Sequence, residues 1–290
     1  MKNKFTILTL LLSIFSFAQV GIGTTSPSDS AILELTFSPE NPQGFLMPRM
    51  TTQQRTAISN PAEGLTIYNT ELKCLESYNG GRWTNFTNIT ATDTNNPTTG
   101  KIWMDRNLGA TQIATSRTDF LAYGSLFQWG RAADGHQLMN WTSASAGSAV
   151  NGTTTTLSDD DTPDDALFII GSSIGDWRST QNNNLWQGVN GTNNPCPSGY
   201  RLPTAAEWEA ERLSWATSNA AGAFASSLKL TTPGYRRFNG GEILAIGTTG
   251  YYWTSTIFGT NSRYFGLSTD SAGIFGHPRS YGFTIRCIKD

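Results

Sequence analysis

Three cysteines and two histidines are the side chains of this 290-residue chain with the greatest potential for chemistry. A thiolate can act as a nucleophile or bind a soft metal, and an imidazole can carry protons near neutral pH. His136 and His277 lie in unrelated segments without the spacing of a ligand pair. The sequence contains neither an H-E-x-x-H motif nor a phosphate-binding loop of the Walker type. These observations predict that the protein is not an enzyme.

A cluster of acidic residues offers a second kind of chemistry. The segment SDDDTPDD spans residues 158–165, and its residues Asp159, Asp161 and Asp164 could bind calcium, because hard cations favour clustered carboxylates on a flexible loop. The segment lacks the glycine and the terminal glutamate of an EF-hand loop. A solvated acidic turn explains the same residues, so both interpretations stay open. No other cofactor is predicted.

The first 18 residues have the pattern of a secretory signal peptide. Lys2 and Lys4 precede an apolar stretch at 5–17, and Ser16 and Ala18 occupy the small-residue positions of a cleavage site. The stretch is too short to span a membrane, so we expect an exported protein, secreted or at the cell surface, without membrane insertion. An oxidising compartment would allow the three cysteines one disulfide and leave one thiol. The net charge of -2, with no basic patch, argues against a nucleic-acid partner.

A helix is predicted after Pro203, where Thr204 and Glu207 have the spacing of a capping box. Trp208 and Trp215 fall on one helical face, which we expect to pack inward. The carboxylates of the helix are expected mainly on other faces, toward water: Glu207, Glu209 and Glu211.

The tryptophans place the main hydrophobic core in the C-terminal two-thirds of the chain. Eight of the nine lie from Trp103 onward, and each buried indole removes a large apolar area from water. Residues 137–195 are rich in Ser, Thr, Asn, Asp and Gly, which predicts long irregular loops. Short strands are predicted elsewhere from β-branched and aromatic runs between turns, at 101–104, 227–230, 251–256, 264–268 and 282–288.

Five motifs in fixed order carry a resemblance to a known family: GKIWMDRNLGAT, YGSLFQWGRAADG, NPCPSGYRLPTAAEW, YYWTST and YGFTIRCIKD. Together they resemble the Fibrobacter succinogenes major paralogous domain, which is related to formylglycine-generating, sulfatase-modifying enzymes with a variant of the C-type lectin fold. The resemblance implies an α+β fold class for residues 100–290: a C-type lectin-like domain with long irregular loops and a short antiparallel sheet. A linker is expected at 91–99, because that segment is polar and lacks periodicity.

The resemblance also bears on the cysteines. Cys196 and Cys287 lie at the edges of the elements that define such a domain, and we pair them in a disulfide. The related oxidases hold copper and the substrate thiol with two neighbouring cysteines near the C-terminal end, where this chain has only Cys287. A sulfatase-modifying oxidase is therefore the least supported alternative.

Residues 19–90 are predicted to form a small, mostly β module. A second capping box, Thr51 with Gln54, predicts a short helix, and Asn79 begins the turn of a predicted hairpin. The segments GFLMPRMTTQQRTAI and EGLTIYNTELKCLESYNGGRW resemble stalk modules of Bacteroidetes surface proteins and phage tail fibres, some of which are trimers. We therefore expect a stalk or assembly module, with a small capping β domain as the alternative. Cys74 is interpreted as a buried free cysteine, or else as an intermolecular crosslink. A homotrimer is expected to form through Leu33, Leu35, Phe45 and Met50.

The stretch from Tyr251 to Tyr281 carries the binding hypothesis. Aromatic and Arg side chains supply contact area there, and Asn and Asp supply adaptable hydrogen bonds. Trp253, Phe265 and Phe283 are expected to be core residues. The protein is thus interpreted as a non-catalytic binding or adhesion protein for a glycan or a surface protein. The alternative is a structural tip or spacer of a surface fibre. The predicted ligand-binding residues are Tyr251, Phe258, Asn261, Arg263, Tyr264, Asp270, His277 and Arg279.

Overall fold

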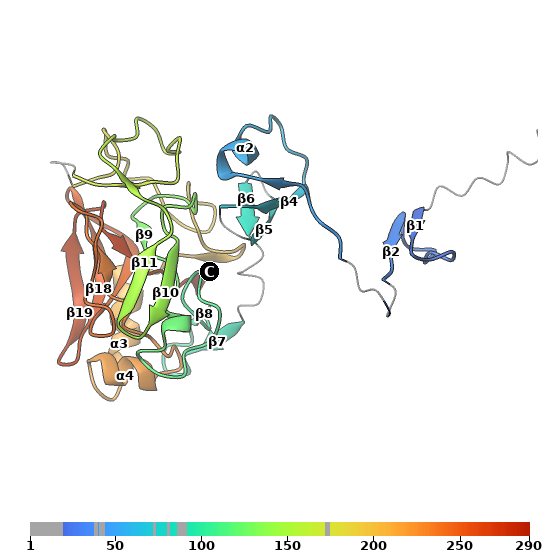
Figure 1. Cartoon of the computed structure of the whole chain (residues 1–290). Helices are drawn as coiled ribbons and strands as arrows, with labels where there is room; N and C mark the ends of the chain where they lie inside the picture. Colours follow the sequence, from blue (N-terminus) through green and yellow to red (C-terminus); the bar gives the residue numbers. More distant parts are fainter. Residues whose placement is uncertain are drawn as a thin grey trace, which may run out of the picture. The chain divides into compact units, whose positions relative to one another are not determined.

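The computed structural model describes residues 20–37, 40, 44–71, 74–79, 82–85, 92–171 and 175–290 (Figure 1). The predicted signal peptide lies outside these residues. The chain divides into two compact units, Met1–Pro48 and Arg49–Asp290. Within the described part, no helix has both the length and the apolar character needed to cross a membrane. Residues 92–290 are called the head below.

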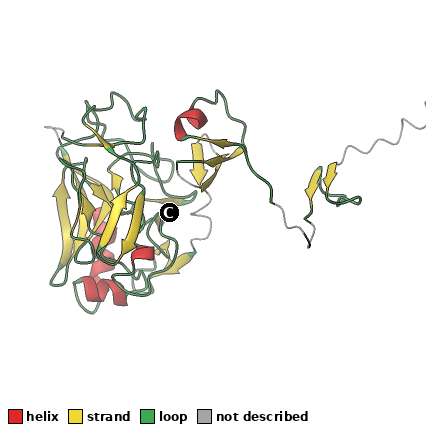
Figure 2. Ribbon diagram, viewed as in Figure 1, coloured by secondary structure: helices red, strands yellow, loops and turns green. Residues whose placement is uncertain are grey.

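The predicted α+β fold class is wrong, because the described chain is mostly β (Figure 2). Its α-helices are α2 (Thr52–Thr56), α3 (Ala205–Leu213) and α4 (Ala220–Ala225). The described residues also contain a 3-10 turn, η2 (Phe120–Ala122). This helical content does not support the expected C-type lectin-like domain. Strands of only two to nine residues, separated by glycine-rich turns, build several small sheets instead.

The N-terminal unit contains two short parallel strands, β1 (Val20–Ile22) and β2 (Leu33–Leu35). Their apolar side chains are not buried within the unit. Exposed fractions reach 57% for Ile22 and 82% for Ile32, although such side chains normally lie inside. The two strands therefore pack on no core of their own.

A four-stranded sheet of order β3-β4-β5-β6 follows. The capping box of Thr51 and Gln54 is confirmed at the start of α2, and the predicted hairpin pairs Tyr78 with Trp83. Cys74 is buried and forms no disulfide within the chain. The strand bounds are β3 (Arg49–Met50), β4 (Thr66–Asn69), β5 (Cys74–Asn79) and β6 (Arg82–Asn85).

Two four-stranded sheets of the head share the last segment of the chain. Their orders are β14-β21-β8-β7 and β16-β15-β20-β9. The first contains β7 (Asp93–Asn95), β8 (Ile102–Met104), β14 (Tyr200–Arg201) and β21 (Ile288–Lys289). The second contains β9 (Phe127–Gln128), β15 (Tyr235–Arg236), β16 (Ile243–Leu244) and β20 (Gly282–Phe283). The single strand predicted at 282–288 is thus divided between two sheets.

A three-stranded antiparallel sheet, β17-β18-β19, completes the head with the helix α3 (Figure 1). Its strands are β17 (Gly250–Phe258), β18 (Asn261–Leu267) and β19 (Ala272–His277). Trp208 of α3 stacks on Phe265 with ring centroids 4.8 Å apart and lies equally close to Trp103. All three side chains are fully buried, so α3 packs inward through Trp208 as predicted. Trp215, the other indole expected on that face, lies beyond the end of α3 and is half-buried.

The expectation that the carboxylates of α3 mainly face water is wrong for Glu207 and Glu211. Glu207 does cap the helix, but it is also held by both Arg201 Nη atoms at 2.8 Å. Burial alone would raise the pKa of Glu207, but the hydrogen bonds and charge of Arg201, together with the hydrogen bonds from Thr204, outweigh burial and lower the pKa to about 2. Glu211 is fully buried and accepts hydrogen bonds from Asn96 Nδ2 at 2.5 Å and Trp215 Nε1 at 2.9 Å.

The loop-rich segment 137–195 contains two small pairs of strands that the sequence did not indicate. They are β10 (Met139–Ser143) with β11 (Ala146–Ala149), antiparallel, and β12 (Thr153–Thr154) with β13 (Phe168–Ile169), parallel. The strand predicted at 227–230 is wrong. Lys229 has a φ of 50° there, and the segment turns so that Leu228 and Leu230 are both buried.

Replacing Trp208 with Ala should destabilise the head by about 4 kcal/mol, because the change removes a buried indole and leaves a cavity. Urea unfolding followed by far-UV circular dichroism measures this. The matched control is Leu213→Ala at the exposed end of the same helix, where 69% of the side chain is exposed and less than about 0.5 kcal/mol should be lost. Equal losses in both variants would contradict the inward packing of α3.

Candidate functional site

Six of the eight predicted binding residues lie on β17, β18 or β19. Directly paired residues of an antiparallel sheet point to the same face. Tyr264 pairs with Phe275 and Trp253, and His277 pairs with Ser262 two residues before Tyr264. Tyr251 pairs with Gly266, two residues after Tyr264, and so shares this face. The sheet therefore gathers three predicted residues, Tyr251, Tyr264 and His277, on one side.

These three rings form part of a closed circuit of aromatic contacts, which we call the aromatic circle. Neighbouring ring centroids are 4.5 to 5.8 Å apart around the circuit, within the range of favourable aromatic pairs. Phe283 of β20 is fully buried and contacts every member, with centroids 4.9 to 6.3 Å away. The members of the circle, in order of contact, are Tyr235, Tyr251, Tyr264, His277 and Tyr281.

Burial keeps four members of the aromatic circle uncharged at neutral pH. Burial, followed by the neighbouring tyrosines, raises the pKa of Tyr264, and burial likewise raises the pKa values of Tyr235 and Tyr281. Burial lowers the pKa of His277, which keeps its imidazole neutral. These three phenols are thus held as neutral hydroxyls that can both donate and accept hydrogen bonds.

Phe258, Asn261 and Arg263 belong to the opposite face of the same sheet. Phe258 pairs with Asn261, and the Arg263 guanidinium carbon lies 3.6 Å from the centroid of the Phe258 ring. Phe258 remains 48% exposed. The predicted site is therefore divided between two faces of β17-β18-β19.

Asp270 and Arg279 lie apart from both groups. Asp270 is exposed on the turn after β18. The length of β18, roughly 20 Å of extended chain, separates this turn from Asn261. Arg279 is 1% exposed, donates hydrogen bonds to Asn182 O and Asn183 Oδ1, and lies over the ring of Trp129. These contacts give Arg279 a structural role in joining the last segment to the 182–183 loop.

The acidic segment uses its carboxylates for contacts within the protein. Asp161 forms an ion pair with Arg178 and accepts hydrogen bonds from Asn182, and Asp159 accepts one from the Ser179 hydroxyl. Asp164 is exposed. Across the described ranges, no three acidic, His or Cys side chains gather in a group able to hold a metal ion. The calcium hypothesis gains no support from this arrangement.

His136 is committed to a buried polar network. Its Nδ1 lies 2.6 Å from Asp134 Oδ1, and its Nε2 accepts the backbone N–H of Gln128 at 3.0 Å. Burial, only partly offset by Asp134, lowers the pKa of His136 to about 4. Both ring nitrogens are occupied, so this imidazole is available neither to a metal nor to a substrate proton.

The segment Gly171 to Gly175 reads GSSIG and has the spacing of a G-x-S-x-G nucleophile elbow. Such an elbow places its serine between a strand and a helix. The segment follows β13, but residues 175–204 contain no helix, and its three central residues lie outside the described chain. The motif therefore lacks the structural context that the chemistry requires.

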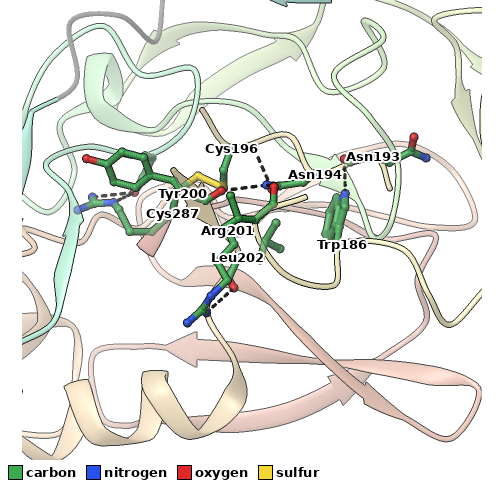
Figure 3. The surroundings of a disulfide bond; sticks show 11 residues. Trp186, Asn193, Asn194, Cys196, Tyr200, Arg201, Leu202 and Cys287 are labelled. Carbon is green, nitrogen blue, oxygen red and sulfur yellow. Dashed lines mark hydrogen bonds between the residues drawn. A yellow bond between two sulfur atoms is a disulfide. The ribbon is translucent and has the colours of Figure 1, made fainter. Parts of the chain in front are cut away.

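The predicted disulfide between Cys196 and Cys287 is confirmed, with Cα atoms 5.9 Å apart (Figure 3). Asn194 fixes the approach to it. Its side chain accepts the Cys196 N–H at 3.2 Å and donates to Tyr200 O at 2.9 Å. The bond thus joins the turn before β14 to the end of the last segment.

The predicted ligand-binding residues omit two members of the circle: Tyr281, which ends the stretch that carries the binding hypothesis, and Tyr235, which lies outside that stretch. Tyr281 stands at the head of the YGFTIRC motif, which was a usable signal. Tyr235 comes from a different sheet and has no local pattern that associates it with Tyr251. Phe283 was correctly expected to be core, as were Trp253 and Phe265.

Comparison with known families finds a match to the phage tail like trimerisation region over residues 21–100. This stretch is less than half of the chain, so the match shows what residues 21–100 are similar to and leaves residues 101–290 unassigned. No curated protein and no solved structure matches the chain.

Acidification should destabilise the head through His136. Its pKa is about 4 in the folded state and 6.5 when unfolded, so the unfolded state binds more protons between these values. The associated stability is fully present above pH 6.5 and falls by about 3 kcal/mol as the pH drops to 4. Urea unfolding at pH 7.5, 5.5 and 4.5 measures it. His136→Gln should flatten this dependence, and His277→Gln should largely retain it. An unchanged slope in His136→Gln would contradict the assignment.

Removing the disulfide should cost about 4 kcal/mol, because the bond closes a loop of 91 residues. The variant is Cys196→Ser/Cys287→Ser, measured by denaturant unfolding. Cys74→Ser is the control for a buried thiol, and dithiothreitol should weaken the wild type but leave the double variant unchanged. A double variant as stable as the wild type would show that the loop is already constrained without the bond.

Proposed function

We propose that the protein is a subunit of an exported, fibre-like assembly in which the N-terminal part trimerises and the head is a non-catalytic tip. The observation that carries this is the match of residues 21–100 to a phage tail like trimerisation region. The confirmed disulfide supports export, since such bonds persist in oxidising compartments.

The exposed apolar side chains of the N-terminal unit support trimerisation. Leu33, Leu35 and Phe45 of the predicted interface are 51%, 44% and 61% exposed, and Met50 is half-buried. Isolated exposed leucines are ordinary, but a short segment whose large apolar residues are nearly all exposed marks an interaction surface. In a trimerisation region, a second and a third copy of the same segment would cover these side chains. The other exposed apolar residues of this segment are Val20, Ile22, Ile32, Phe37 and Leu46.

Within this assembly the head serves either as a structural tip or as a binding module for a glycan or a surface protein. The family match favours the structural role, since it concerns a fibre-like module alone. The aromatic circle favours binding, because four of its five side chains are half-buried and so partly open at the surface. A non-catalytic head is consistent with the hydrogen-bonded ring nitrogens of His136 and with the lack of a helix in the described residues 175–204.

Sedimentation velocity of the exported chain should show a trimer at micromolar concentration. Leu33→Asp/Leu35→Asp should convert it to a monomer, because charges replace apolar side chains that would be buried between copies. Leu213→Asp, which changes an equally exposed leucine of the head, is the control and should remain trimeric. A monomeric wild type would overturn the assembly, and loss of the trimer in both variants would remove the assignment to this segment.

A further inference from the structure

We propose that the aromatic circle is a platform for a sugar ring, so that the head binds glycans through Tyr235, Tyr251, Tyr264, His277 and Tyr281. This inference rests on the proposed binding role of the head and names its ligand class. It does not depend on the trimer, because all five residues and Phe283 belong to one head.

The geometry of the circle suits a ligand that lies on it. Phe283 is fully buried and contacts all five members, and Trp253 packs against it with ring centroids 4.3 Å apart. These two buried rings close the inner side of the circle, so a ligand meets it from the other side. A pyranose ring has one apolar C–H face, and such a face can stack on a partly exposed aromatic ring while its hydroxyls remain at the edge.

The hydroxyls of the circle are available to a ligand. None of its four tyrosines has a hydrogen-bond partner for its hydroxyl among the residues that the structure describes. Other tyrosines of the head are different: Tyr123 donates to Ala144 O at 2.8 Å, and Tyr252 donates to Thr231 O at 2.8 Å. A protein that satisfies its other phenols within the fold has left these four together for water or a ligand.

The charge around the circle also favours a sugar over a cation. Arg237 lies near enough to lower the pKa values of Tyr235 and Tyr281, against the larger effect of burial. A nearby guanidinium repels cationic ligands and can donate hydrogen bonds to sugar hydroxyls or carboxylates. Glu242 is the cross-strand neighbour of Arg237 and accepts its backbone N–H through its carbonyl oxygen. No ion pair between these two side chains occurs in the described structure.

The size of the circle argues against a protein partner as its main ligand. A stable protein interface buries about 800 Å² on each partner. Five side chains, of which Tyr264 is 7% exposed, supply only a fraction of that area. A sugar ring needs no more than two or three of them.

The scaffold holds the circle in place before any ligand arrives. Its members come from β15, β17, β18, β19 and the segment before β20, and these strands belong to two hydrogen-bonded sheets. A ligand therefore does not pay for ordering the site, which is how a small contact area can still bind.

The test uses the full exported chain on an array of immobilised neutral and uronic-acid oligosaccharides, followed by titration of the best ligand. Tyr235→Phe/Tyr281→Phe keeps the rings and removes two hydroxyls, and it should weaken binding about tenfold or more. Tyr281→Ala also removes a ring and should abolish binding. The matched control is Phe258→Ala, an exposed aromatic residue on the opposite face of the same sheet, which should bind as the wild type does.

Thermal unfolding and sedimentation of each variant separate binding from folding and assembly. A trimer that binds no oligosaccharide at millimolar concentration would overturn the glycan site but leave the fibre proposal intact. Binding that Phe258→Ala abolishes and the Tyr→Phe pair retains would move the site to the other face. Selective loss of uronic-acid ligands in Arg237→Ala would support the site and assign the carboxylate to the guanidinium. A change of oligomeric state in the Tyr→Phe pair would instead identify the circle as a contact between heads.

Discussion

The last nine residues of the head, Gly282 to Asp290, are the constraint on which its architecture depends. Gly282–Phe283 pairs with β9 and β15, and Ile288–Lys289 pairs with β8 and β14, so one segment belongs to two sheets. Between the two pairings the chain must change partners without leaving buried backbone groups unsatisfied. The disulfide at Cys287 fixes this crossing to the turn before β14. The segment therefore holds both sheets in place, and its Phe283 contacts every member of the aromatic circle.

Buried arginines hold the irregular segments where sheets cannot. Arg286 is 1% exposed and donates to Asn107 Oδ1, Met104 O and Leu228 O, and burial lowers its pKa to about 10. Arg236 likewise donates to the carbonyls of Gly241 and His136, and Arg131 to those of residues 165 and 167. Each guanidinium presents five donors in a fixed plane, which suits scattered loop carbonyls better than a lysine would. A chain with so few long strands can thus remain rigid.

The local signals in the sequence predicted local structure well. Both capping boxes start helices as expected, because the partners are three residues apart. The prediction that Glu211 faces water was wrong for the opposite reason. Its partner Asn96 is 115 residues away, and no helical pattern indicates such a contact. The predicted fold class was wrong because it was taken from the family resemblance, and strands of two or three residues are too short for sequence periodicity to correct it. The aromatic circle combines two sheets, so only its members on β17-β18-β19 could be found from one stretch.

The proposed trimer and the proposed sugar platform strengthen each other in a way that neither does alone. A platform without a deep cavity gives weak binding per site, because it buries little of its ligand. Three heads on one assembly would face a repetitive glycan surface together, and linked sites raise the overall affinity by about 10²- to 10⁴-fold when the geometry allows simultaneous contact. A rigid, disulfide-closed head suits this arrangement, because ordering a flexible head on binding would cancel part of the gain in affinity. The N-terminal module then has to hold three such heads together.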